Sequence, residues 1–120
     1  MKRLKKRADF LKLAKGAAVR MPGFILQYLE GAAAHYEVDK AYVGFTITKR
    51  QGNAVLRNRI RRRLREAVRL ANASHAIAPG KYALIGRKES LTISFSALRD
   101  SLVKAFVKAE NDAIAKRTKN

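Results

Sequence analysis

Cysteine is absent from the 120 residues, and so is tryptophan. Without cysteine the chain can form no disulfide bond, perform no thiolate chemistry and hold no cysteine-ligated zinc. The apolar residues are also divided into short runs, none near the ~20 apolar residues of a membrane-spanning helix. Lys12 and Lys15 interrupt the apolar residues near the start, which argues against a signal peptide. We therefore expect a soluble protein of the cytoplasm.

Acidic residues are scarce: 9 Asp and Glu face 27 Lys and Arg, which leaves a formal net charge of +18. Such an excess opposes compact folding by self-repulsion and predicts a polyanionic partner. Nucleic acid is the first candidate. An anionic membrane surface is the second, but a basic helix that lies in a membrane interface needs Trp or Phe on its apolar face, and the basic helix of this chain has neither.

The length favours one domain, and the 48% of hydrophobic residues are enough for one modest core. We take residues 1–120 as that domain. The basic start, residues 1–7, is expected to be mobile because it has charge but almost no apolar surface to bury. The last residues, 115–120, are expected to fray.

The first half of the chain predicts a short helix followed by strands. Asp9 can cap the helix, Phe10, Leu13 and Ala14 recur at helical spacing and would face the core, and Gly16 would end it. Residues 17–30 carry apolar runs that Pro22 and Gly23 interrupt, which predicts one strand or two short ones. A loop is expected over 31–40, and alternating β-branched and aromatic residues predict a strand over 42–48.

The second half predicts a helix, a strand and a helix. The long helix spans about 53–73, a short strand spans 81–87, and Ser94 can cap a last helix. That last helix carries an apolar stripe at helical spacing, formed by Leu98, Leu102, Phe106 and Ala109. The order indicates an α+β fold in which helices cover a small sheet.

The long helix carries six arginines among the nine positions from Arg57 to Arg65. At 100° per residue one side is apolar and would face the core: Leu56, Ile60, Leu64, Ala67 and Ala71, with Val68 at its edge. The opposite side holds Asn58, Arg61, Arg62, Arg65 and Arg69, while Arg57, Arg59 and Arg63 lie on the flanks. Only Glu66 is present to neutralise them.

This arginine face predicts the binding of a polyanion. A charge run is often only a solvated surface, but such surfaces mix signs, whereas Arg57, Arg61 and Arg65 form like-charged pairs at i,i+4 that cost ~0.2–0.5 kcal/mol each. Arginine also grips phosphate with two parallel hydrogen bonds and stacks on bases. No helix-turn-helix or zinc motif accompanies the helix, so folded RNA fits better than a DNA groove.

No catalytic site of a protein nuclease is visible. His35 and His75 fall in expected loops without a carboxylate partner at triad or metal-ligand spacing, and the nine acids are scattered singly. There is no Gly-rich phosphate loop, no nucleophile with its base and no cluster of metal ligands. We expect no catalytic residue, no metal site and no cofactor bound by the protein alone.

The stretch "KRQGNAVLRNRIRRRLREAVR", residues 49–69, closely resembles the signature of the bacterial ribonuclease P protein component, an Arg-Asn-Arg motif after a Gly-x-Ala-Val turn. The positions in register are Gly52, Ala54, Val55, Arg57, Asn58, Arg59, Arg62, Arg65 and Glu66. A basic start, a "DF" in the first helix and the strands "VGFTITKR" and "YALIGRK" extend the resemblance to about residues 3–110.

The resemblance implies a fold, partners and site residues. The fold would be αβββαβα with a left-handed crossover between the parallel strands on either side of the arginine helix, as in the ribosomal-protein-like folds. A catalytic RNA would hold the magnesium ions and the active site of the holoenzyme, which removes the 5′ leader from precursor tRNA. The expected contacts with the catalytic RNA are Arg57, Asn58, Arg59, Arg62 and Arg65, joined through the helical projection by Arg61 and Arg69.

The resemblance also implies a cleft between the first helix and the sheet that holds the single-stranded leader. Phe10, Lys49 and Arg50 would lie at or near it, with Gln27 in place of a tyrosine of similar proteins. Ala14 stands where a second aromatic is common, so stacking on the leader, worth ~1–3 kcal/mol per base, would be reduced. Phe10 could equally be core. The competing functions are a structural ribosomal RNA-binding protein and a stand-alone nuclease.

Overall fold

The structure is a computed structural model that describes residues 1–29 and 39–118, with side chains as far as residue 112. The loop expected over 31–40 therefore lies largely outside the described residues, and so does His35. The elements are β1 (Lys2–Arg3), α1 (Arg7–Ala14), β2 (Ala17–Met21), β3 (Phe24–Tyr28), β4 (Ala41–Thr46), η1 (Lys49–Gln51), α3 (Ala54–Ser74), β5 (Gly80–Gly86), η2 (Lys88–Leu91) and α4 (Phe95–Thr118).

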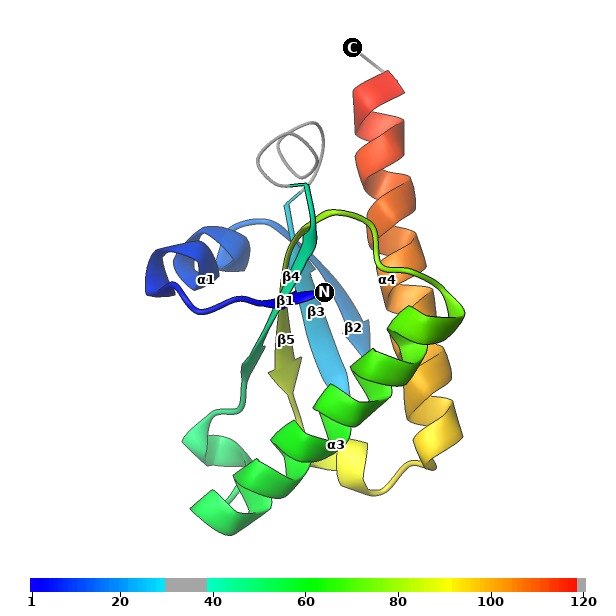
Figure 1. Cartoon of the computed structure of the whole chain (residues 1–120). Helices are drawn as coiled ribbons and strands as arrows, with labels where there is room; N and C mark the ends of the chain where they lie inside the picture. Colours follow the sequence, from blue (N-terminus) through cyan, green and yellow to red (C-terminus); the bar gives the residue numbers. More distant parts are fainter. Residues whose placement is uncertain (30–38, 119–120) are drawn as a thin grey trace.

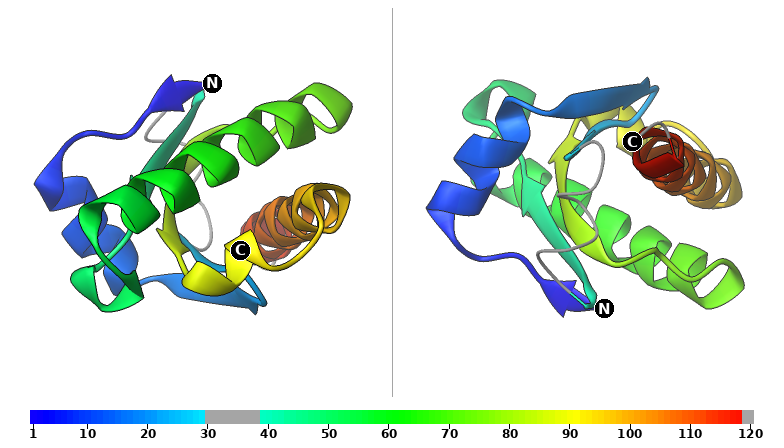
Figure 2. Two further views of the ribbon diagram at one scale, coloured as in Figure 1. Left: turned by 90° about the horizontal axis from the view of Figure 1, so that it is seen from below. Right: turned by 90° about the horizontal axis from the view of Figure 1, so that it is seen from above.

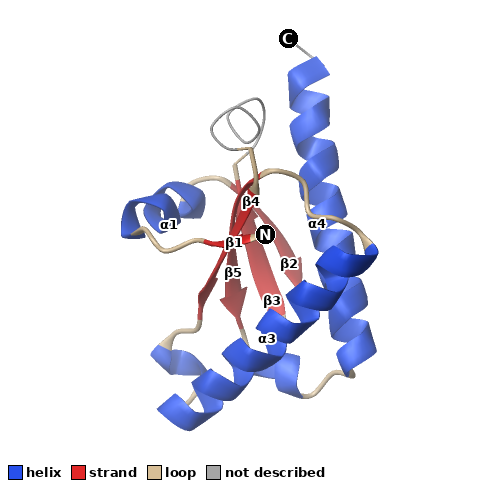
Figure 3. Ribbon diagram, in the orientation of Figure 1, coloured by secondary structure: helices blue, strands red, loops and turns tan. Residues whose placement is uncertain are grey.

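The described strands form one mixed sheet in the order β1-β4-β5-β3-β2. Strands β4 and β5 are parallel and are connected through α3. Strand β3 pairs antiparallel with β2 on one side and with β5 on the other. Helix α1 covers one face of the sheet, and α3 and α4 lie together on the other (Figures 1 and 2). Figure 3 shows the sheet between these helical layers. The α+β class is confirmed, and residues 17–30 form two strands that a Pro22–Gly23 turn joins.

The main core lies between the sheet and the two long helices. Strand alternation sends the buried Phe24, Leu26 and Tyr28 of β3 to this face. The predicted stripe of α4 is buried throughout. The predicted stripe of α3 is buried as well, except that Leu56 remains partly exposed near the start of the helix.

Helix α1 differs in two ways from the sequence-based expectation. Lys6, not Asp9, occupies the N-cap position, and the Asp9 carboxylate instead accepts a hydrogen bond from Lys81 of β5 at 3.0 Å. Ala14 is exposed rather than facing the core, because a helix of only two turns buries a single residue, Leu13, completely. Phe10 is partly buried beside that leucine.

The basic start is not a free tail in the structure. Lys2 and Arg3 pair in parallel with Tyr42 and Val43 of β4, and Leu4 is 5% exposed in a small cluster under α1. The sequence led us to expect a mobile start over residues 1–7, and the structure places the centre of this segment on the sheet, where the buried side chain of Leu4 anchors it.

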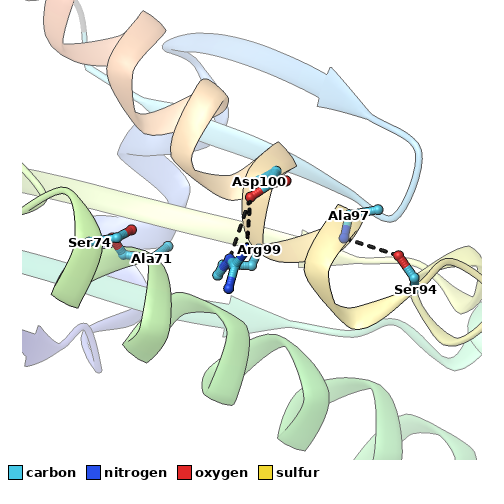
Figure 4. A network of polar contacts seen from close by, with 6 residues as sticks. All are labelled: Ala71, Ser74, Ser94, Ala97, Arg99 and Asp100. Atoms are coloured by element: carbon cyan, nitrogen blue, oxygen red, sulfur yellow. Dashed lines mark hydrogen bonds and ion pairs between the residues drawn. The ribbon is translucent and has the colours of Figure 1, made fainter.

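Helix α4 starts as the sequence predicts and ends later. The Ser94 hydroxyl accepts a hydrogen bond from the amide of Ala97 at 3.1 Å, which is the geometry of an N-cap (Figure 4). The helix then continues to Thr118, so residues 115–118, which the sequence led us to expect to fray, are helical in the structure. Within the described part of the chain, no helix has both the length and the apolar composition that a membrane crossing requires.

Candidate nucleic-acid interface

The arginine helix begins at a tightly built turn. Asn53 is the N-cap of α3, and its side-chain oxygen accepts a hydrogen bond from the amide of Leu56 at 2.9 Å. Gly52, just before it, has φ of +137°, and a Cβ there would lie 2.5 Å from the Leu56 side chain. Only glycine fits both the backbone angle and the space. This turn fixes where the helix begins, and the burial of Ile60 and Leu64 fixes which side faces outward.

The predicted RNA-binding residues share one exposed surface. The exposed members are Asn58, Arg59, Arg62, Arg65 and Arg69, and the partly buried members are Arg57 and Arg61. The side-chain oxygen of Asn58 accepts a hydrogen bond from Arg61 at 3.2 Å, so this pair restrains its own geometry. We call these seven side chains the guanidinium face. The structure places them on the outer side and the flanks of α3, as the helical projection predicts.

One internal acid partly neutralises the guanidinium face. Glu66 accepts two hydrogen bonds from Arg69, at 3.1 and 2.5 Å, on the exposed surface. These hydrogen bonds lower the pKa of Glu66 and raise that of Arg69. The pKa of Arg65 is lowered, first by partial desolvation and then by the neighbouring charges of Arg3 and Arg61. The face therefore retains strong positive potential around Arg65.

Arg63 belongs to the same run but has a structural role. Its Nε donates to the carbonyl of Ser90 at 2.8 Å and its Nη2 donates to the carbonyl of Ile93 at 2.6 Å. The guanidinium also lies 5.5 Å from the centre of the Phe95 ring. These contacts tie α3 to the segment that enters α4. The sequence placed Arg63 on a flank, and nothing in its local pattern distinguishes it from its neighbours.

A groove runs beside the guanidinium face, between α3 and the start of α4. It has a volume of about 740 Å³ and its lining combines arginines with an apolar floor. The lining residues are Arg59, Arg62, Arg63, Arg65, Glu66, Arg69, Leu91 and Phe95. Guanidinium groups above apolar and aromatic surface suit a phosphate chain whose bases can lie against the floor.

The residues predicted for a leader cleft lie on the opposite face of the sheet and at its end. Gln27 is in register with Ala83 of β5, which is in register with Gly44 of β4, so the three form one row on the α1 side. The Phe10 ring lies against Gly44, where an added Cβ would come within 2.3 Å of its Cζ. Phe10 and Gln27 are therefore about two strand spacings apart, on the order of 10 Å.

Lys49 and Arg50 lie apart from that row. Both are exposed in η1, the turn between the carboxyl end of β4 and α3. The next residue, Gln51, accepts a hydrogen bond from the amide of Lys88 at 2.9 Å, which holds this turn against η2. The turn η1, which holds Lys49 and Arg50, thus connects strand β4 beside Phe10 to helix α3 with the guanidinium face.

Titratable side chains elsewhere do not form a metal site. In the described ranges no three His, Asp or Glu side chains gather as ligands of one ion. His75 does have a carboxylate neighbour, contrary to the sequence-based expectation: its Nε2 lies 3.5 Å from Glu110 of α4. That pair joins residues 35 positions apart, which is why no spacing rule could find it. The described residues therefore do not fit a magnesium site of their own.

Comparison with known proteins gives a consistent family. The model of the family described as ribonuclease P matches residues 1–110. A ribonuclease P protein component of Paramagnetospirillum magneticum is 49% identical over 107 residues, covering 86% of this chain and 78% of its own length. One from Gluconacetobacter diazotrophicus is 46% identical over 108 residues, covering 89% and 90%. A Staphylococcus aureus RNase P protein mutant with defective mRNA degradation activity is 30% identical, with a TM-score of 0.71 over 90% of this chain and 87% of that one.

Proposed function

The chain belongs to the ribonuclease P protein family, and on that premise we propose that it binds the catalytic RNA of ribonuclease P through the guanidinium face of α3 and the 5′ leader of precursor tRNA on the α1 side of the sheet. Its function is that of an RNA-binding protein component in tRNA processing. We expect it to act in the cytoplasm. The structural ribosomal protein and the stand-alone nuclease have no observation that favours them.

The observation that carries the proposal is the one-sided charge of α3. Seven arginines and one glutamate lie on this helix, and among the residues that the structure describes only Arg63 of the seven is held by backbone carbonyls. Four of the others are exposed and two are partly buried, and their like charges cost folding free energy in the absence of RNA. Phosphates would remove that repulsion and release counterions on binding.

The leader site is supported by the α1 side of the sheet. Gly44 and Ala83 are small, so the backbone of the sheet is not covered by large side chains beside Phe10. Gln27, in the same row, adds a side-chain amide. Lys49 and Arg50 would hold phosphates where the strand leaves the sheet. An aromatic ring, an amide and two cations suit a single strand that is bound with little sequence preference.

We place the active site in the RNA. The described residues hold no cluster of carboxylates or histidines that fits a magnesium ion, so the ions would be bound by RNA phosphates. The protein would contribute by neutralising phosphate charge, which lets the RNA fold at lower magnesium concentration, and by positioning the leader.

Reconstitution tests the proposal directly. The purified protein is added to its cognate catalytic RNA, and 5′ cleavage of precursor tRNA is followed at low magnesium. We expect cleavage to depend on the protein at low magnesium and much less at high magnesium. Protein-independent cleavage at every magnesium concentration would contradict the proposal, and so would cleavage by the protein without RNA.

A second measurement isolates the leader site. The holoenzyme should bind precursor tRNA with a leader of several nucleotides more tightly than mature tRNA. Gln27→Ala should narrow this difference, whereas Lys104→Ala, an exposed change on α4, should not. Equal affinity for the two tRNAs in the unaltered holoenzyme would remove the leader site from the proposal.

A further inference from the structure

The edge strand β1 places a second set of cations beside the guanidinium face. Arg3 is in register with Val43 of β4, whose side chain is buried on the α3 side of the sheet. The next residue, Leu4, is buried in the cluster on the α1 side, and its amide donates to the Val43 carbonyl at 3.0 Å. Because side chains alternate along a strand, the anchoring of Leu4 turns Arg3 toward α3.

A groove of about 280 Å³ lies between β1 and α3. Its floor is apolar, formed by Val43 and Phe45, and cations surround it. The full lining is Met1, Lys2, Arg3, Val43, Phe45, Arg65 and Arg69. The Arg65 guanidinium lies 5.8 Å from the centre of the Phe45 ring, so the groove shares this arginine with the guanidinium face.

A second hollow, of about 350 Å³, continues from Arg3 around the edge of the sheet. It is lined by Arg3, Leu4, Lys5, Lys6, Asp9, Tyr42 and Lys81. Lys81 is paired with Asp9 at 3.0 Å. Arg3, Lys5 and Lys6 have no carboxylate partner among the residues that the structure describes. Arg3 lines both hollows and joins them into one surface.

The charges on this surface repel one another in the free protein. Partial desolvation lowers the pKa of the Arg65 guanidinium, and the charge of the nearby Arg3 lowers it further. Strand β1 contains only two residues. When it pairs with β4, it brings the charge of Arg3 close to that of Arg65. An anion bound between Arg3 and Arg65 would attract both guanidinium groups and offset the repulsion between them.

We propose that β1 and the segment after it form, together with Lys81 of β5, a second RNA-binding surface, the edge track, made of Arg3, Lys5, Lys6 and Lys81. Its occupant is the phosphate backbone of the same catalytic RNA that docks on α3. The argument for that occupant is continuity, since Arg65 and Arg69 belong to the guanidinium face and line the groove next to Arg3. The inference rests on the proposed function and extends its RNA contact around the sheet edge.

The absence of cysteine gives a direct test. A single cysteine introduced at Lys5, which is exposed on the edge track, can carry an iron chelate that cleaves nearby RNA. Val55→Cys, 70% exposed at the start of α3, reports the guanidinium face, and Lys104→Cys on α4 is the control. In the complex with catalytic RNA we expect cleavage from Lys5→Cys and Val55→Cys at different nucleotides, and none from Lys104→Cys.

The outcomes separate this inference from the proposed function. Cleavage of catalytic RNA from Val55→Cys but not from Lys5→Cys overturns the edge track and leaves the proposed function intact. No cleavage from either position overturns both. When precursor tRNA is added, cleavage from Lys5→Cys in the tRNA alone would also overturn the inference, because the occupant would then be the substrate.

The salt dependence of binding gives a second test. Arg3→Gln removes one charge from an exposed side chain and keeps β1 and its Leu4 anchor. We expect the slope of log affinity against log salt to fall by ~0.7–0.9 for the lost phosphate contact. Lys104→Gln removes the same charge and should leave the slope unchanged. An equal slope for Arg3→Gln and the unaltered protein would overturn the inference.

Discussion

Helices α3 and α4 pack side by side on the same face of the sheet, yet their outer surfaces differ. Both bury a stripe of leucines and alanines. On α4 the charged residues of 95–112 are mixed in sign, with three basic and three acidic, and Arg99 lies beside Asp100 (Figure 4). On α3 seven arginines accompany one glutamate.

The difference separates the part of α3 that serves the fold from the part that we propose to bind RNA. Helix α4 demonstrates that a helix can pack on this face of the sheet while its residues 95–112 carry no net charge. The like charges of α3 are therefore not required for packing, which fits their proposed role in binding RNA. Changes to both helices can test this separation.

The largest expected effect is on RNA affinity. Replacing Arg62 and Arg65 together by alanine should weaken binding of the catalytic RNA about 100-fold or more, because two charge-assisted contacts of ~1.5–3 kcal/mol each are lost. Replacing Arg99 and Lys104 of α4 removes the same charge and should change affinity little. Titration of labelled RNA at fixed salt measures both, and equal losses would mean that only net charge matters.

On the buried side the two helices should respond alike. Leu64→Ala in α3 and Leu102→Ala in α4 each remove a side chain with 0% exposure. Each should lower the free energy of unfolding by about 2–5 kcal/mol. Urea unfolding measures both. A much smaller loss of unfolding free energy for Leu64→Ala would show that contacts at the ends of α3, and not its buried stripe, hold the helix on the sheet.

A smaller effect separates one arginine from its neighbours. Arg63→Ala should lower the free energy of unfolding by about 1–2 kcal/mol, because two hydrogen bonds to carbonyls at the entry to α4 are lost. Arg62→Ala should leave stability nearly unchanged and weaken RNA binding instead. If Arg63→Ala kept full stability and lost affinity, Arg63 would belong to the guanidinium face.

The sequence was enough for the elements whose signals are local. Helical spacing predicted the stripes of both long helices, and Ser94 predicted the start of α4. The motif from Gly52 to Arg59 predicted the turn, the outward arginines and the family. These features depend on residues within a few positions of one another, where periodicity and capping rules apply.

Features that depend on distant partners could not be predicted in this way. The role of Arg63 requires the carbonyls of Ser90 and Ile93, about 30 positions away. The docking of the basic start requires the free edge of β4, and His75 meets Glu110 only after both helices pack. Leu4 was the one residue in the sequence that could have indicated a docked start, but the four cations around it suggested an exposed segment.

The smallest predicted effect addresses the cost of like charge on α3. Arg61→Glu changes the pairs with Arg57 and Arg65 from repulsive to attractive, and should raise stability by a few tenths to about 1 kcal/mol at low salt. Lys104→Glu on α4 alters net charge equally but exchanges one favourable neighbour, Asp100, for another, Lys108, so it should be nearly neutral. At ~1 M salt, where the screening length is about 3 Å, the gain should vanish. A gain that persisted there would be due to helix propensity or packing, and α3 would then carry no electrostatic penalty for RNA to relieve.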